Sequence, residues 1–371
     1  MSPICTATRP AAGERAAALG AAAGGGRWGH RRRARRAAAL CGCGLRFQSG
    51  RHRLRGVDPG GGAPLPPLPR RRALLPLLAE WLCANDGKDE RATRLLRDAH
   101  LFILPTMNPD GFKKRRRGNA KRFDLNRNFP DPVKHKGTDL RAVQTQTQPE
   151  VAAIMELMLS RTWAGAANFH EGAEVVVYSY DGYASGTWRV LGRPHPAPDD
   201  ATFVHLSRVY ADAHTTMARS KAFPGGIING ASWYPIYVAA GCMDFTIEAS
   251  KRKFRRQRDL PVLWAENREA LLALPIAAAF GGARGQVRAA DTNATLAATL
   301  TAAPATPNGY GPPVPFYASK GAGFYARPLA PGKYTLVASA PGYAPAEAAI
   351  TVPADGRGVA QDFLLAPAAR R

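Results

Sequence analysis

The chain has 371 residues, 45% of them hydrophobic, and a formal net charge of +23. The hydrophobic share is that of a globular protein with a core. No run of 18 apolar residues occurs, so the sequence predicts no transmembrane helix. Five scattered cysteines do not make a disulfide framework.

The positive charge is concentrated in residues 1–72, which hold 15 arginines and only two acids. This segment is rich in Ala, Gly and Pro, has no hydrophobic periodicity, and cannot bury enough apolar surface to offset its ordering entropy. It reads as a disordered basic tail, a transit peptide or a mistranslated stretch, and we favour the last. As a nucleic-acid-binding arm it has too few aromatic residues for base stacking, with only Trp28 and Phe47.

The pattern changes at residue 73. Helical spacing of apolar residues predicts helices near residues 74–82, 149–158, 203–217 and 262–280. Short apolar runs predict strands at 101–104, 164–169, 174–178 and 243–247. Helices alternating with strands are typical of an α/β fold, here a mixed sheet sandwiched by helices over residues 73–281.

Beyond Gly281 the helical pattern ends. Strands are predicted at residues 286–289, 323–326, 333–339 and 348–352, separated by turn dipeptides such as Asn308-Gly309 and Pro331-Gly332. The sequence therefore predicts a small all-β sandwich over residues 282–367 as a separate domain.

Polar clusters follow several of the predicted strands. His170 ends one apolar strand, where a ring nitrogen can face a metal. Glu248 lies between apolar neighbours on a later strand, which raises a carboxyl pKa and suits a general base. Arg117 and the Asn126-Arg127 pair can bind a carboxylate. Taken alone, His170 also fits a structural histidine, and Glu248 also fits a strand-end salt bridge. The arginine and asparagine cluster also fits a solvated loop.

Taken together and in order, these clusters resemble the regulatory, carboxypeptidase N/E-like branch of the zinc metallocarboxypeptidases. The matching strings are Leu-Pro-Thr-Met-Asn-Pro-Asp-Gly-Phe (104–112), Phe-Asp-Leu-Asn-Arg-Asn-Phe-Pro-Asp (123–131), Ala-Asn-Phe-His (167–170), Gly-Gly-Ile-Ile-Asn-Gly-Ala-Ser-Trp-Tyr (225–234) and Phe-Thr-Ile-Glu (245–248). The resemblance implies a truncated carboxypeptidase fold, and the β-sandwich resembles the transthyretin-like domain that follows it in this branch.

The resemblance implies a zinc-assisted hydrolysis with four residues at the reacting bond. His170 would be the third zinc ligand and Glu248 the general base that activates water. Arg117 would stabilise the developing oxyanion, and Tyr234 would close over the bound peptide end.

It also implies how a peptide or protein C-terminus is held. Asn126 and Arg127 would bind the terminal carboxylate. Asp181 would pair with a C-terminal Lys or Arg side chain. Residues 235–241 are shorter than the matching stretch in the family, which removes part of the wall of this pocket. No nucleic-acid partner is expected. The branch implies an extracellular or secretory location, although the arginine-interrupted sequence near the N-terminus does not predict a signal peptide.

One departure from the family concerns the metal. The first two zinc ligands of the family come from a His-x-x-Glu motif, and no histidine of this chain has a glutamate three residues on. The motif would fall in the Gly/Pro/Arg segment before residue 73, which is why we favour mistranslation there. Glu171 takes the place of a glycine beside His170, and neither it nor Glu174 is expected to replace the missing ligands.

Three hypotheses follow. The first is a zinc metallocarboxypeptidase that removes C-terminal residues, Lys or Arg above all. The second is a non-catalytic, carboxypeptidase-like protein that binds peptides. The third, ranked last, is a nucleic-acid binder that uses residues 1–72.

Overall fold

The computed structural model describes residues 3–8, 74–130, 147–180, 194–230, 234–253, 256–306, 309 and 311–369, and these belong to one compact unit. The predicted basic segment therefore lies outside the described residues, apart from residues 3–8. Within the described residues, no helix is both long enough and apolar enough to cross a membrane.

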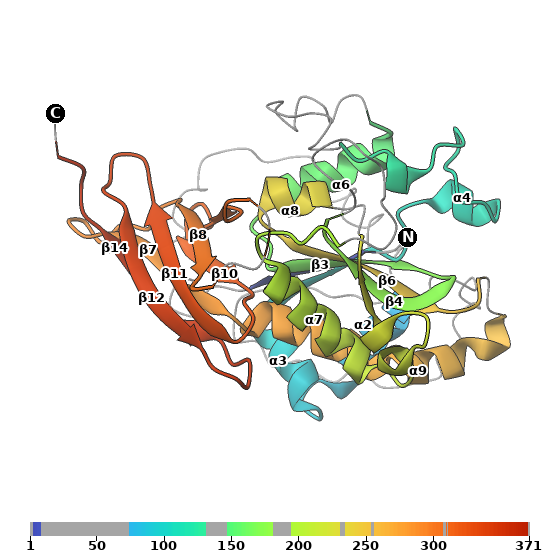
Figure 1. Cartoon of the computed structure of the whole chain (residues 1–371). Coiled ribbons are helices and arrows are strands. Elements are labelled where there is room, and N and C mark those ends of the chain that lie inside the picture. The colour runs from blue at the N-terminus through green and yellow to red at the C-terminus, as the bar shows by residue number, and fades with distance from the viewer. Residues whose placement is uncertain are drawn as a thin grey trace, which may run out of the picture. The chain divides into compact units, whose positions relative to one another are not determined.

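A six-stranded mixed sheet forms the centre of the α/β part (Figure 1). Its strands are β1 (Pro3–Thr8), β2 (Ala99–Ile103), β3 (Gly165–His170), β4 (Ala173–Tyr178), β5 (Ile227–Asn229) and β6 (Met243–Ser250). Their order across the sheet is β2-β1-β3-β6-β4-β5. Strands β3 and β6 are parallel, whereas β4 runs antiparallel to β6 and β1 antiparallel to both of its neighbours.

Strand β1 is a feature that the sequence does not predict. It pairs with β2 on one side and with β3 on the other, with Ile4 opposite both Ile103 and Ala167. A six-residue strand inside a sheet is held by backbone hydrogen bonds on both edges, which need no hydrophobic periodicity.

Helices cover both faces of the sheet (Figure 1). One face carries α2 (Leu74–Asn85), α3 (Glu90–Asp98), α7 (Asp200–Ala213) and α9 (Leu260–Phe280). The other carries α6 (Pro149–Leu159) and α8 (Tyr234–Ala240). The shorter turns are α4 (Pro109–Lys113), η2 (Leu125–Arg127), η3 (Met217–Arg219), η4 (Pro224–Gly226) and η5 (Gln257–Asp259). The predicted α/β fold with a mixed sheet between helices is confirmed.

The two faces of β3 and β6 have different partners because strand side chains alternate. Ala167, Phe245 and Ile247 join the core cluster that also contains residues of α2, α7 and α9. Ala166 joins the second cluster, with residues of α6 and α8. By the same alternation, His170 and Glu248 lie on the α6/α8 face of the sheet.

Helix α7 is shorter than its apolar stripe predicts. It ends at Ala213, because His214 adopts an extended backbone with ψ of 141°. Met217, the last residue of the predicted stripe, is instead buried in η3. A buried apolar residue at helical spacing therefore does not by itself extend the helix.

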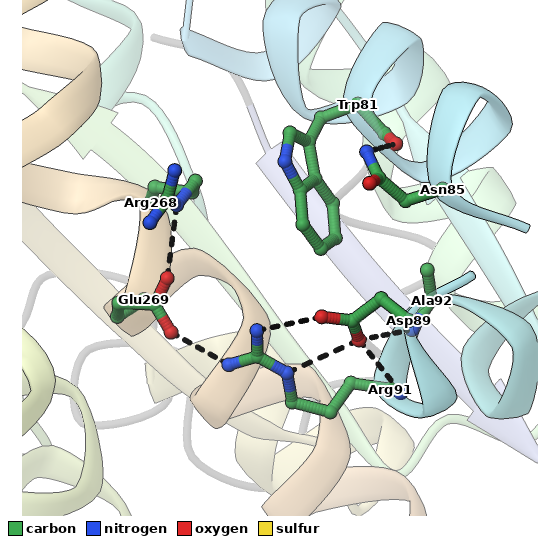
Figure 2. A network of polar contacts seen from close by, with 7 residues as sticks. All are labelled: Trp81, Asn85, Asp89, Arg91, Ala92, Arg268 and Glu269. Carbon is green, nitrogen blue, oxygen red and sulfur yellow. Dashed lines mark hydrogen bonds and ion pairs between the residues drawn. The ribbon is translucent and has the colours of Figure 1, made fainter.

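A polar network joins helices α3 and α9 (Figure 2). Asp89 caps α3 by accepting hydrogen bonds from the backbone of Arg91 and Ala92. The Arg91 guanidinium bridges Asp89 and Glu269 at 2.8 and 2.6 Å, and Glu269 also accepts from Arg268 Nε at 2.9 Å. The hydrogen bond from Arg91 lowers the pKa of Asp89 to about 2.

The residues after α9 form two sheets with a core of their own. The strands are β7 (Ala283–Ala289), β8 (Thr299–Pro304), β9 (Phe316–Tyr317), β10 (Phe324–Arg327), β11 (Gly332–Ser339), β12 (Ala346–Val352), β13 (Val359–Ala360) and β14 (Phe363–Leu365). One sheet has the order β10-β7-β13, with β14 also on β7, and the other has the order β12-β11-β8-β9. Buried residues of both sheets form one hydrophobic cluster. The predicted all-β sandwich is confirmed as a fold class.

Candidate active site

His170 and Glu248 lie side by side at the carboxyl ends of two parallel strands. His170 is the last residue of β3, and its register partner on β6 is Glu248. Adjacent strands are about 4.8 Å apart, and register partners project from the same face. The structure therefore brings together the histidine and the glutamate that the sequence assigns to one site.

Both side chains have a buried polar atom without a hydrogen-bond partner among the described residues: Nε2 of His170 and Oε2 of Glu248. Buried polar atoms are nearly always paired in folded proteins. Unpaired atoms at neighbouring positions therefore mark a place where a ligand can bind.

The electrostatic surroundings hold His170 neutral. Burial and, to a lesser extent, the positive charges of Arg117, Arg127 and Lys253 together lower the pKa of the His170 imidazole to about 3. A neutral imidazole keeps a lone pair for a hydrogen-bond donor or a metal.

Glu248 is shifted in the direction that suits a base. Burial raises the pKa of its carboxyl above the ordinary value, and Glu171 adds to the rise. Lys253 and Arg117 act in the opposite direction. A carboxylate with a raised pKa accepts a proton more readily than an ordinary one.

Asn168 fixes the alignment of the two strands. It lies two residues before His170 on the same face, and its Nδ2 donates to Phe245 O at 3.0 Å and to Thr246 Oγ1 at 2.9 Å. The side chain is 1% exposed. This buried contact holds β3 against β6 at the Asn168–Thr246 pair, two residues before His170 and Glu248.

The arginine and asparagine residues come from a loop after α4 that Asp124 organises. Asp124 Oδ2 accepts from Arg117 Nε at 2.6 Å, and Asp124 Oδ1 accepts from the backbone N–H of Asn126 at 3.0 Å. Asn126 is buried, whereas Arg127 is exposed. One carboxylate thus connects Arg117 to the turn that carries Asn126 and Arg127.

The charges of Arg117 and Arg127 both act on His170, and that of Arg117 also acts on Glu248. Coulomb interactions of this kind weaken beyond about 8 Å at physiological salt. Arg117 and Arg127 therefore contribute positive charge to the surroundings of His170.

Three residues with a part in the site were not predicted from the sequence. Asp124 holds the loop, Asn168 joins β3 to β6, and Lys253 places a positive charge near His170 and Glu248. Asp124 and Asn168 lie inside the matching strings, so their position next to site residues was a usable signal. Lys253 follows β6 by three residues and belongs to no motif. Its charge acts on both His170 and Glu248, and this proximity follows only from the fold.

The roles assigned to the predicted site residues all stay predictions, and two of these residues are not described in full. Asp181 lies outside the described residues. Tyr234 is the first residue of α8, which places its backbone on the α6/α8 face, but its side chain is outside the described part.

The described residues do not fit a zinc ion by themselves. Within them, no group of three His, Cys, Asp or Glu side chains could hold a metal. Glu174, near His170 in sequence, instead pairs with Lys251 at 3.2 Å and accepts from Thr216 Oγ1 at 3.1 Å. His170 can supply one ligand, whereas catalytic zinc takes three protein ligands.

Comparison with known proteins identifies the family of the α/β part. The sequence profile of the zinc carboxypeptidases matches residues 71–270. This match contains every site residue discussed above.

Similar proteins carry the same family name. Carboxypeptidase SOL1 of Arabidopsis thaliana is 35% identical over 308 residues, which cover 81% of this chain and 59% of that protein. The mouse carboxypeptidase N catalytic chain is 34% identical over 320 residues, covering 76% of this chain and 68% of the relative. Human carboxypeptidase D is 34% identical over 312 residues, covering 77% of this chain and only 21% of its own length. This chain belongs to the zinc carboxypeptidase family.

Proposed function

We propose that this protein binds the C-terminal residue of peptides in a carboxypeptidase cleft and that it prefers Lys or Arg at that position. The observation that carries the proposal is the pairing of His170 with Glu248 on adjacent parallel strands. It is supported by the positive charge of Arg117, in the loop that Asp124 organises, which acts on both side chains. The first candidate function is that the protein then hydrolyses the last peptide bond of the bound peptide.

The loop would hold the peptide end. A planar guanidinium recognises a carboxylate through two parallel hydrogen bonds. Arg127, exposed beside the buried Asn126, offers such a group. Arg117 would then lie at the last peptide carbonyl, where its positive charge would stabilise an oxyanion.

Glu248 would act as the general base, since burial raises the pKa of its carboxyl. The cofactor expected for the family is one zinc ion. At least one of its ligands would have to come from outside the described residues, because within them no group of three His, Cys, Asp or Glu side chains could hold a metal.

Four further assignments rest on family membership. Asp181 would pair with the basic side chain of the substrate, and Tyr234 would close over the bound end. The β-sandwich would be a transthyretin-like domain, and the protein would work outside the cell or in the secretory pathway.

A second candidate is peptide binding without hydrolysis. The observation that favours it is that the described residues contain no group of three side chains able to hold a zinc ion. The carboxylate-binding loop does not depend on the metal, so recognition of a peptide end could persist without it.

Both candidates are tested with the full chain and a short fluorescent peptide ending in Arg, offered with a free carboxylate or as the C-terminal amide. Binding is followed by fluorescence anisotropy, bound zinc by elemental analysis, and release of free Arg by chromatography. Zinc at one ion per chain with release of Arg supports the carboxypeptidase. If the chain binds the peptide with a free carboxylate but not the amide, holds no zinc and releases no Arg, the result supports the non-catalytic peptide-binding protein.

Arg127→Gln provides the specific control, with Arg97→Gln, a change at an exposed helix position, as its matched variant. Arg127→Gln should weaken binding of the free acid to the level of the amide, and Arg97→Gln should not. Equal binding of acid and amide to the unmodified chain would exclude both candidates.

A further inference from the structure

Seven of the ten residues from Lys113 to Arg122 are Lys or Arg, and none is acidic. We call residues 113–122 the cationic loop. Lys113, Lys114, Arg115, Lys121 and Arg122 are exposed. In the described part of the chain, none of these five forms an ion pair with a carboxylate, whereas Arg117 pairs with Asp124.

The cationic loop is held in a compact shape by its own backbone. Asn119 N–H donates to Phe123 O at 2.9 Å, and Arg122 N–H donates to Asn119 O at 3.0 Å. Asn108 Nδ2 ties the loop to the start of α4 through Arg117 O at 3.1 Å. A side chain at Gly118 would meet the backbone of Arg122 at 2.7 Å, so the close approach requires glycine.

Two of the loop arginines have an unfavourable backbone. Arg115 has φ of 50° and Arg122 has φ of 68°, in the left-handed region that residues other than glycine seldom adopt. Such a conformation persists where the surroundings enforce it, and it is concentrated at binding sites. Asn119 supplies the enforcement, since its Oδ1 accepts from the backbone of Lys121 and Phe123.

The loop adjoins the peptide cleft. Arg117 belongs to the loop and also acts electrostatically on His170 and Glu248. A peptide with its carboxylate at Asn126 and Arg127 and its last carbonyl at Arg117 continues upstream past Arg117. The residues before the C-terminal one then come within reach of the remaining loop cations.

We infer that the cationic loop selects peptides with acidic residues immediately before the C-terminal residue. This inference rests on the proposed function. Seven like charges held together repel one another, and negative charges on a bound peptide relieve that repulsion. A rigid loop presents these charges without an ordering cost on binding.

The inference is tested with the full chain and two fluorescent peptides of equal length, both ending in Lys. One has Asp or Glu at the three positions before the Lys, and the other has Ser there. Anisotropy at about 0.05 M salt should show the acidic peptide binding about tenfold more tightly, as expected for three exposed ion pairs. At about 0.5 M salt the difference should largely disappear because of screening.

The loop variant is the triple change Lys113→Gln, Lys114→Gln and Lys121→Gln. Its matched control is Lys320→Gln, Lys333→Gln and Arg357→Gln, which removes three exposed charges from the β-sandwich. The loop variant should lose most of the preference for the acidic peptide and keep its affinity for the Ser peptide. The control variant should keep both.

Each other outcome is decisive. Equal binding of the two peptides would overturn the inference and leave the proposed function standing. If neither peptide binds, both the inference and the proposed function are overturned. Equal binding of the acidic peptide and its C-terminal amide would show that the loop attracts polyanions independently of the cleft, and would also overturn the inference.

Discussion

Arg327 of β10 and Asp199, the residue before α7, form a buried ion pair at 2.7 Å between the β-sandwich and the α/β part. Their side chains are 1% and 5% exposed. The same guanidinium donates to Gly241 O at 2.6 Å, directly after α8, and Asp199 also accepts from the Tyr237 hydroxyl of α8. The sandwich is thereby connected to the helix that begins with Tyr234.

Removing Arg327 should strongly destabilise the fold. Arg327→Ala leaves Asp199 buried without its cation, a change that costs about 3–5 kcal/mol of unfolding free energy. The matched control is Arg357→Ala, which breaks the ion pair with Asp355 on the surface, where Arg357 is 83% exposed. Exposed pairs contribute about 0–1 kcal/mol. Urea unfolding of the two variants should separate them clearly, and equal midpoints would contradict the role given to Arg327.

The His170 imidazole should make stability depend on pH in acid. Its pKa is about 3 in the folded chain, against 6.5 for an ordinary histidine. Between these values the unfolded chain binds more protons, so the free energy of unfolding falls as the pH drops. The contribution is at most about 1.4 kcal/mol per pH unit. Urea unfolding of the parent chain and of His170→Gln between pH 7 and 4, with a chelator present, measures it.

The slope of unfolding free energy against pH should be smaller for His170→Gln than for the parent chain. Identical slopes would mean that His170 is protonated as readily in the folded chain as in the unfolded one.

Glu248→Gln should make the fold more stable at neutral pH. Burial raises the pKa of the carboxyl in the folded chain above its ordinary value of 4.5. The unfolded chain therefore ionises first as the pH rises, and the free energy of unfolding falls between pH 4.5 and the raised pKa. A neutral amide removes this effect, and the gain in melting temperature should appear at pH 7 and vanish near pH 4. The exposed Glu80→Gln serves as the comparison. A lower melting temperature for Glu248→Gln at pH 7 would contradict the prediction that the ionised Glu248 carboxylate destabilises the fold.

Asn168→Ala should loosen the two central strands. The change removes the contacts to Phe245 O and Thr246 Oγ1 from a buried position, at a cost of about 1–3 kcal/mol. Thr246→Val removes one of the two partners at nearly constant volume and should cost less. Urea unfolding gives both values. If Asn168→Ala also weakens peptide binding more than Thr246→Val does, the alignment of His170 with Glu248 depends on this side chain.

Much of the fold could be predicted because burial is strong and periodic in particular segments. The apolar residues of α6 fall at helical spacing, and the helix spans Pro149–Leu159 with Val151, Ile154, Met155 and Met158 buried. Strand β11 alternates as its sequence predicts, with Tyr334, Leu336 and Ala338 buried. In contrast, α3 has a charged sequence, and its position depends on the Asp89 cap and on Arg91, which bridges to α9.

The site was predicted from residue types in order along the chain, and the structure makes two of those residues, His170 and Glu248, register partners. The partnership of Asp124 with Arg117 and the effect of Lys253 on Glu248 could not be predicted, because both depend on chain segments that approach one another only after folding.

The sequence by itself determined the family, the alternation of helices and strands, and the residues able to bind a carboxylate or accept a proton. The family follows from the motifs that the chain shares with it, and the other two follow from local spacing and side-chain chemistry. Only the tertiary structure decided that His170 and Glu248 are register partners, that Arg327 is buried against Asp199, and that the charge of Arg117 in the cationic loop acts on His170. Each of these depends on strand register and on packing between distant segments, which spacing along the chain does not specify.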